Sequence, residues 1–213
     1  PYTPDITLTS EEGLDSRLYG EISSLEGTKR VYGRMFSYVP AAFDASRLTD
    51  NYKESMEGIT ETDGGLFVPP EKSWLISYDE DQLEWAETDL IEGNISEEKL
   101  NEQNGVIAVA IHLRDNITCE TNNLQLGDKV YIETPNGIKE MTVMGILRSL
   151  PFNSPKPSLT SFITTEHLFT ELTGKSTFKA VDIQLKRINQ EQTVNEIKNM
   201  LDDSVSFMDK RQK

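Results

Sequence analysis

Carboxylates are the reactive side chains that this sequence supplies most freely. Adjacent acidic residues occur at Asp79-Glu80-Asp81, Glu97-Glu98 and Asp202-Asp203. Two carboxylates on either side of a glycosidic bond can hydrolyse it, one as the acid and the other as nucleophile or base. Such a pair is defined by distance in space, so sequence neighbours alone do not predict a glycosidase. We expect no catalytic residue, and a carbohydrate-active enzyme is only the third alternative.

A thiol and two imidazoles are the other groups with chemistry of their own: Cys119, His112 and His167. A cysteine beside a histidine can act as a nucleophile, but neither histidine lies in a recognisable motif. We interpret all three as structural residues. One cysteine excludes an internal disulfide and a cysteine zinc site, and too few ligands remain for a transition-metal site. We expect no metal and no cofactor.

Gly174-Lys175-Ser176 matches the end of a phosphate-binding loop, but Phe169 stands where that loop needs its first glycine. The tripeptide also follows an expected helix, whereas a phosphate-binding loop leads into one. We therefore predict that Gly174 caps the helix before it and that no nucleotide binds here.

Two further patterns depend on their context. Asp50–Glu61 has the span of a calcium loop, yet Tyr52 and Ser55 replace a ligand and the required glycine. Asn94-Ile95-Ser96 and Asn116-Ile117-Thr118 match the glycosylation sequon, which matters only in a eukaryotic secretory protein. Neither pattern predicts a site by itself.

The charge of the chain is concentrated in one region. The 213 residues include 36 acidic and 21 basic side chains, a net charge of −15. Residues 50–102 hold 16 of the acidic and three of the basic residues, a net −13. This balance excludes a nucleic-acid binder, which needs a basic surface, and argues against a chain that lies on an anionic membrane. The acidic region is either a solubilising surface or a site for a cationic peptide or protein.

The length fits one domain, or a domain with a sizeable insertion. The longest apolar run is Val106–Ile111, six residues, against the roughly 18 needed to span a bilayer. The sequence begins Pro1-Tyr2-Thr3-Pro4, with neither Met nor a signal-peptide pattern. We expect an excised or processed fragment.

The first element is predicted to be an amphipathic helix, because Leu14, Leu18, Ile22 and Leu25 recur at helical spacing. Thr9 with Glu12 suggests its capping box, and Gly27 its C-terminal cap.

Strands and short helices are predicted for the rest of the chain. The clearest strand signals are the two strands of a hairpin around Pro135-Asn136-Gly137 and the continuous apolar run Val106–Ile111, which is expected to be a buried strand. The other expected elements are the strands 31–39, 74–78, 161–163, 178–186 and 205–208, and the helices 79–86, 96–103 and 165–173, with one more helix capped by Asn189 and Gln192. Residues 40–65 and 151–157 are expected to be loops. Trp74 and Trp85 are interpreted as core residues rather than partner anchors.

These elements predict an α+β fold. Helix–strand–strand near the start and strand–helix–strand at the end would form one split layer, with a β-rich part inserted into it. We expect residues 1–78 and 176–213 to form the split layer, and residues 79–175 the insertion.

Several short segments occur in an order that resembles the extracytoplasmic (periplasmic core) domain of the MacB/FtsX-like permease family of ABC transporters. Each segment is short, and the resemblance depends on the ordered set across nearly the whole chain. The segments are Leu25–Tyr32, Tyr78-Asp79-Glu80, Leu90–Ile95, Gly105–Val109, Leu126–Val130, Met141–Leu147 and Val181–Leu185.

The resemblance implies a porter-like α+β layer with an inserted β-rich subdomain, on the outer face of the bacterial cytoplasmic membrane. It implies a domain without catalytic activity, between transmembrane helices of a permease that can be a homodimer. A separate cytoplasmic ATPase subunit would drive the permease, and the outer domain would bind a substrate or an extracellular partner. The alternative is a freestanding extracytoplasmic binding or adhesion module with an acidic binding face.

Overall fold

The structure is a computed structural model that describes residues 3–50, 64–69, 72–109, 111–114, 117–120, 122–150, 152 and 160–211, with 111–114 and 117–120 described by their backbone alone. The chain divides into two compact units. The terminal unit is Pro1–Phe36 with Ser176–Lys213, and the central unit is Ser37–Lys175. The helices in the described ranges fall short of the length and hydropathy that a bilayer-crossing segment needs.

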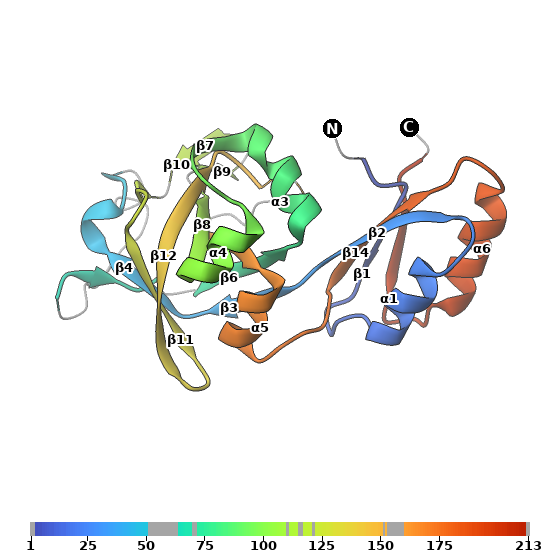
Figure 1. Cartoon of the computed structure of the whole chain (residues 1–213), viewed down its shortest axis with the longest axis horizontal. Helices are drawn as coiled ribbons and strands as arrows, with labels where there is room; N and C mark the ends of the chain where they lie inside the picture. Colours follow the sequence, from blue (N-terminus) through green and yellow to red (C-terminus); the bar gives the residue numbers. More distant parts are fainter. Residues whose placement is uncertain are drawn as a thin grey trace. The chain divides into compact units, whose positions relative to one another are not determined.

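The terminal unit is a four-stranded antiparallel sheet whose strands come from both ends of the chain (Figure 1). The strand order is β15-β1-β14-β2. The bounds are β1 Ile6–Thr9, α1 Ser16–Ser23, β2 Thr28–Arg34, β14 Ala180–Leu185, α6 Gln190–Met200 and β15 Ser206–Asp209.

One face of this sheet carries the core. Alternate residues of a strand point to opposite faces, so Ile6 and Leu8 share a face with Ile183 and Val181, their register partners on β14. The same cluster also buries Leu14, which precedes α1, Ile22 of α1, and Val194 and Ile197 of α6. Val194 and Ile197 are three residues apart, which puts them on one side of α6.

The other face of the sheet holds a buried polar network. Thr7 and Asp182 are register partners, and the Thr7 hydroxyl donates to Asp182 at 2.8 Å. The Arg34 guanidinium makes an ion pair with the other Asp182 oxygen at 2.6 Å, and both side chains are almost fully buried. This network joins residues that are 175 and 148 positions apart, so it links the two ends of the chain.

The central unit is built on a nine-stranded mixed sheet in the order β3-β6-β13-β8-β12-β11-β4-β5, with β7 paired to β12. β13 runs parallel to β6, and β8 parallel to β12. Its strands are β3 Phe36–Val39, β4 Ala41–Asp44, β5 Leu66–Phe67, β6 Ser73–Tyr78, β7 Leu90–Gly93, β8 Gly105–Val109, β11 Lys129–Thr134, β12 Gly137–Leu147 and β13 Ser161–Thr165. The helices are α3 Glu80–Ala86, α4 Glu97–Gln103 and α5 Glu166–Thr173, with 3-10 turns Ala45–Arg47 and Glu87–Asp89. β9 Ile111–Arg114 and β10 Ile117–Glu120 form a separate hairpin.

The large sheet is strongly curved. Phe43 of β4 packs against Phe162 of β13 with ring centroids 6.4 Å apart, although three strands separate β4 from β13 in the sheet order. In a flat sheet these strands would lie about 19 Å apart, at about 4.8 Å per step. The curvature encloses Phe43, Phe67 and Phe162, which are all fully buried.

The predicted α+β class is confirmed, and many of the predicted elements have matching bounds. Asp79 and Gln82 form a complete capping box at α3, and Ser96 caps α4, which ends at left-handed Asn104. The hairpin at Pro135-Asn136-Gly137 joins β11 to β12. Gly174 is the left-handed cap of α5, as predicted.

Several local predictions were wrong. Thr9 belongs to β1, and the cap of α1 is Asp15, whose side chain accepts from the Arg17 N–H. The predicted strand 31–39 is two strands, β2 and β3, and part of the predicted loop 40–65 is β4. At α6 the Asn189 side chain makes no cap hydrogen bond; Asn189 has φ of 56°, and its carbonyl accepts from Thr193 instead.

The first boundary between the units also differs from the prediction. Residues 37–78 were expected in the split layer, but β6 pairs with β13 along five residues and β4 pairs with β11. These backbone hydrogen bonds put 37–78 in the central unit. The division returns to the terminal unit between Lys175 and Ser176, where the sequence-based boundary also lies.

Gly27 is required for close packing rather than as a helix cap. It is outside the positive-φ region, and a Cβ on it would lie 1.8 Å from Oγ1 and 2.9 Å from Cβ of Thr193 on α6. The Thr193 hydroxyl bonds the Asn189 carbonyl at 3.3 Å, and the side chain is buried. The helix can approach the α1–β2 turn only because residue 27 has no side chain.

We predict that Gly27→Ala destabilises the terminal unit by about 1–3 kcal/mol, the usual cost of overpacking. The matched control is Gly20→Ala in α1, where a Cβ meets nothing within 4 Å. This control should stabilise by about 0.5–1 kcal/mol, because alanine favours the helix. Thermal unfolding by circular dichroism, with hydrogen exchange of α6 peptides, measures both effects. Equal effects of the two substitutions would contradict the packing explanation.

Candidate partner-binding surface

The acidic region predicted from the sequence is carried largely by α3, α4 and the segment that joins them. Ten of its carboxylates lie in 79–102, where Lys99 is the single basic residue. The whole central unit has 24 acidic and ten basic residues, a net −14, whereas the terminal unit has a net −1. Residues 51–63 of the acidic region, and with them most of the calcium-like segment Asp50–Glu61, lie outside the described residues.

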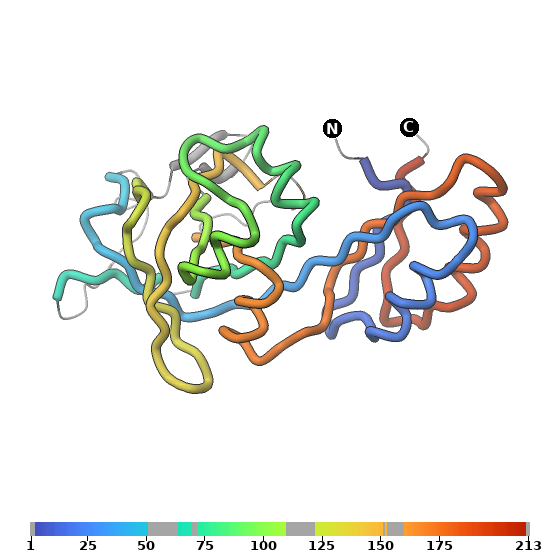
Figure 2. The backbone as a smooth tube through the Cα atoms, viewed as in Figure 1, coloured from blue at the N-terminus to red at the C-terminus, as the bar shows by residue number. Residues whose placement is uncertain are grey.

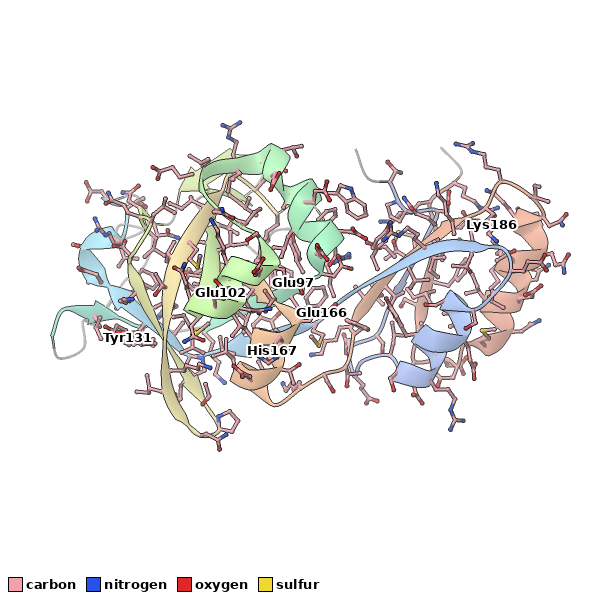
Figure 3. All side chains as sticks on the ribbon, viewed as in Figure 1. Glu97, Glu102, Tyr131, Glu166, His167 and Lys186 are labelled. Atoms are coloured by element: carbon pink, nitrogen blue, oxygen red, sulfur yellow. The ribbon has the colours of Figure 1, made fainter. Side chains whose placement is uncertain are left out.

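Three carboxylates from separate elements meet in this surface, and we call them the carboxylate cluster: Asp79, Glu97 and Glu166. Figure 3 shows Glu97 on α4 close to Glu166 at the start of α5. Each of the three stands at the first turn of a helix, where the helix dipole favours negative charge. Their mutual repulsion works against that preference.

The strand register explains why Asp79 and Glu166 are neighbours. Tyr78 ends β6 and Thr165 ends β13, and these two residues are partners in the parallel pairing. Asp79 and Glu166 follow them directly in the chain. Adjacent strands are about 4.8 Å apart, so both carboxylates leave the same end of the sheet side by side.

A hydrogen bond brings Glu97 to the same place. The Thr165 hydroxyl, which also caps α5 through the Leu168 N–H, donates to Asn101 Oδ1 of α4 at 2.5 Å. Asn101 is four residues after Glu97, so both side chains lie on one side of α4. The bond therefore holds the Glu97 side of α4 against the start of α5.

The cluster shifts the acidity of its members. Partial burial, together with the charges of Asp79 and Glu97, raises the pKa of Glu166 to about 7. Burial also raises the pKa of Asp79, opposed by the hydrogen bond from the Gln82 N–H and reinforced by the charge of Asp81. A cation placed at the cluster would relieve this repulsion, which makes the surface suited to a cationic partner.

The other candidate residues are dispersed. His167 is exposed on α5 and lies 3.3 Å from Glu171, one turn along the helix. His112 and Cys119 are register partners in the β9–β10 hairpin, where the structure describes the backbone alone. Asp202 caps a turn by accepting from Ser204, and the Lys175 amine donates to Ser37 at 3.2 Å.

The remaining predictions divide between core and surface. Trp74 is buried, as predicted, and Trp85 is half-buried against Phe152, with ring centroids 6.1 Å apart. In the first sequon, exposed Asn94 accepts from the Ser96 N–H, and Ser96 caps α4. Asn116 of the second sequon is outside the described part of the chain. Among the described side chains, no group of three or more His, Cys, Asp or Glu residues is arranged to hold a metal ion.

Sequence reasoning missed Glu166, because this residue lies 64 positions beyond the acidic region in the chain. The available signal was its place directly after a strand and at the start of a helix. A parallel pairing of strands 74–78 and 161–163 would have put it beside Asp79.

No family model matches this sequence, and no curated protein matches it. Solved structures do match. The extracellular domain of the noncanonic ABC-type transporter YknZ from Gram-positive bacteria has a TM-score of 0.54 and 11% identity, covering 95% of this chain and 98% of that one. The periplasmic region of MacB from Actinobacillus actinomycetemcomitans has a TM-score of 0.56 and 12% identity, covering 96% and 87%.

The chain has the fold of an extracellular domain of an ABC-type transporter. This confirms the resemblance to the MacB-like periplasmic core that the ordered segments predicted. At 11–12% identity the likeness concerns the fold, so residues of those proteins are not transferred to this chain.

We predict that Glu166 makes the central unit less stable as the pH rises from 4.5, its ordinary pKa, through about 7. In that range the unfolded state releases the Glu166 proton before the folded state does, so stability present at low pH is lost. Between pH 5 and pH 8, wild type should lose about 1–2 kcal/mol relative to Glu166→Gln, after allowance for the solvent-exposed part of the side chain.

Urea unfolding followed by tryptophan fluorescence measures this difference, because both tryptophans, Trp74 and Trp85, lie in the central unit. The matched control is Glu98→Gln, which removes an exposed carboxylate from the first turn of α4. The same pH dependence in the two variants would show that the cluster is not its source.

Proposed function

We propose that the chain is the extracellular domain of an ABC-type permease. In this proposal it is not an enzyme; it couples the cycle of a cytoplasmic ATPase subunit to an extracellular substrate or protein partner, and it lies on the outer face of a bacterial cytoplasmic membrane. The fold likeness to YknZ and MacB domains, over at least 95% of this chain, supports the proposal.

The observation that carries the proposal is that both ends of the chain leave the same end of one sheet. β1 starts at Ile6 opposite Asp209, the last residue of β15, and the Lys210 N–H donates to the Asp5 carbonyl at 2.8 Å. Figure 2 traces the blue first strand and the red last strand side by side. A domain placed between two membrane-spanning segments needs this arrangement, because both segments start from the same membrane surface.

The same topology suits the transmission of movement. β1 and β15 are antiparallel neighbours and share the core with α1 and α6. The chain crosses to the central unit beyond Arg34 and returns before Ala180, at the opposite end of these strands. A shift of the two membrane segments would therefore act on the sheet of the terminal unit, and from it on the two connections to residues 37–175.

We expect the full-length protein to have an apolar span of about 20 residues on either side of this chain. In a Cys119→Ser background, Ile138→Cys should react with a membrane-impermeant maleimide on intact cells, because Ile138 is 75% exposed. The Cys119→Ser protein alone is the control. An ATPase subunit should copurify with the full-length protein.

The flanking spans distinguish this proposal from a freestanding extracytoplasmic module, which would also react from outside. If either span is missing, or if labelling requires permeabilised cells, the permease proposal is wrong.

The carboxylate cluster supports a second candidate function, compatible with the first and with a freestanding module: binding of a cationic peptide or protein. Glu97 and Glu166 repel each other in the free protein, and positive charge on a partner would offset that repulsion. The neighbouring exposed acids of α3 and α4, among them Glu80, Glu84 and Glu98, extend the attraction over a wider surface.

We predict that oligolysine binds the chain with an affinity that falls steeply with salt. The affinity should rise from pH 6 to pH 8, because Glu166 loses its proton in this range.

The double variant Glu97→Gln/Glu166→Gln should bind oligolysine about fivefold more weakly than wild type, because each exposed ion pair contributes about 0.5 kcal/mol. Isothermal calorimetry measures it, with Glu133→Gln, an exposed acid of β11, as the control. An equal loss in the control, or no binding at low salt, would leave only the solubilising role.

A further inference from the structure

The loop between β14 and α6, residues Lys186–Asn189, carries two cations followed by an exposed apolar side chain. Ile188 is 73% exposed, and Lys186 and Arg187, both exposed, directly precede it in the chain. A single exposed isoleucine is common on protein surfaces, so its meaning depends on where the loop lies and on how firmly it is held.

The loop is fixed by hydrogen bonds at both ends. The Lys186 N–H donates to the Gly27 carbonyl at 2.8 Å, and the Gln190 side chain donates to the Lys186 carbonyl at 3.1 Å. Asn189 adopts a left-handed conformation with φ of 56°, which costs free energy in a residue with a side chain. The backbone therefore turns sharply into α6 and leaves Ile188 projecting outward.

The loop lies at the end of the sheet where both chain ends emerge. Leu185, the last residue of β14, donates its N–H to the Asp5 side chain at 2.8 Å. Lys210, the residue after β15, donates its N–H to the Asp5 carbonyl. Loop, first strand and last strand thus meet at Asp5. If the chain ends continue into membrane segments, this end of the terminal unit faces the bilayer.

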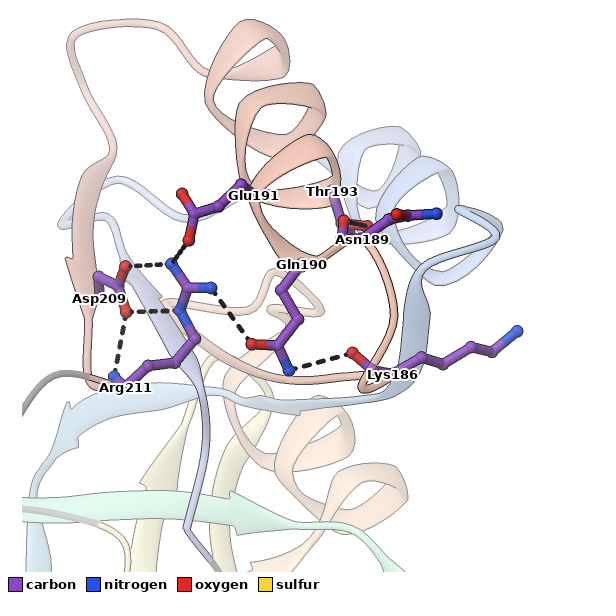
Figure 4. Close-up of polar contacts among 7 residues, drawn as sticks. All are labelled: Lys186, Asn189, Gln190, Glu191, Thr193, Asp209 and Arg211. Carbon is purple, nitrogen blue, oxygen red and sulfur yellow. Dashed lines mark hydrogen bonds and ion pairs between the residues drawn. The ribbon is translucent and has the colours of Figure 1, made fainter.

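The two ends of this sheet differ in the charge of their side chains. At the loop end, Arg211 is held by Asp209 at 2.7 Å and by Glu191 at 2.9 Å (Figure 4), and the hydrogen bond from Arg211 lowers the pKa of Asp209 to about 2. Arg211 offsets one of these two negative charges, so the three groups together carry a net −1. Lys186, Arg187 and Lys210 have no ion pair among the described residues.

The opposite end of the sheet is acidic. Glu11 and Glu12 follow β1 there, and Asp202 and Asp203 precede β15, all four exposed. The terminal unit is close to neutral as a whole, so its charges form a dipole with the positive pole at the loop. An anionic surface would attract the loop end and repel the other.

We propose that the β14–α6 loop is a lipid-contact element: Ile188 enters the headgroup region of the membrane while Lys186 and Arg187 bind anionic lipid headgroups. This rests on the proposed function, which brings the loop end to the membrane. Each cation near an anionic surface contributes about 1 kcal/mol, and the membrane segments supply a high local concentration of lipid. Weak contacts suffice under these conditions, even though the net charge of the whole chain is negative.

The test uses an environment-sensitive fluorophore (NBD) on Ile188→Cys in a Cys119→Ser background. Ile138→Cys is the matched control, since Ile138 on β12 has nearly the same exposure, 75%. The full-length protein is examined in nanodiscs that contain phosphatidylglycerol and spin-labelled lipid. We expect a blue shift and lipid quenching at residue 188 and neither at residue 138. Lys186→Gln/Arg187→Gln should weaken loop binding roughly thirtyfold, and high salt should weaken it as well.

Two results would overturn the proposal. The first is quenching at residue 188 no greater than at residue 138. The second is a blue shift at residue 188 without lipid quenching, which would mean that a protein segment covers the loop.

A second arm separates this proposal from the permease proposal. The 213-residue chain alone is anchored through a C-terminal hexahistidine tag to vesicles with nickel-chelating lipid and phosphatidylglycerol. Quenching at residue 188 here supports lipid contact whatever the flanking gene encodes. If flanking spans are found but neither arm shows quenching, lipid contact is wrong and the permease proposal stands.

Discussion

The terminal unit depends on the pairing of β1 with β14, which joins residues about 175 positions apart. Without β14, the helices α1 and α6 would have no common sheet on which to bury their apolar sides. The buried Asp182 side chain reinforces the pairing, since it accepts from Thr7 of β1 and pairs with Arg34 of β2. An ion pair so little exposed is costly to desolvate and stabilises only when its partners are well placed. It therefore favours one register of the three strands over a shifted one.

The pairing of β1 with β14 also determines which charged side chains lie at each end of the terminal sheet. It brings Asp5, the β14–α6 loop and Lys210 to one end of the terminal sheet, while the acidic surplus of the chain belongs almost entirely to residues 37–175. The net charge of −15 thus describes two surfaces with different roles. In the central unit, the carboxylates of the cluster repel one another and a cation would reduce that repulsion. In the terminal unit, Lys186, Arg187 and Lys210 have no ion pair among the described residues.

Elements with local signals could be predicted from the sequence, and elements that depend on distant partners could not. The Asp79–Gln82 capping box and the Pro135-Asn136-Gly137 turn are specified by residues within a few positions, and both predictions were correct. β1 is only four residues long, too short for its alternation to identify it, and its partner strands lie at the other end of the chain. The carboxylate cluster could not be predicted for the same reason, because it requires the parallel register of β6 and β13. The family resemblance predicted the architecture correctly, but the strand partners of 37–78 were needed to place the first boundary.

The two crossings between the units impose an order on folding during synthesis. Every strand of the large sheet lies between residues 36 and 165, so this sheet can form before residues 166–213, 48 in all, have been synthesised. β1 is synthesised first but has no strand to pair with until β14 appears. Domains commonly fold as their chain is completed. β1 must therefore remain unpaired until β14 and β15 have been synthesised and can form the terminal sheet with it.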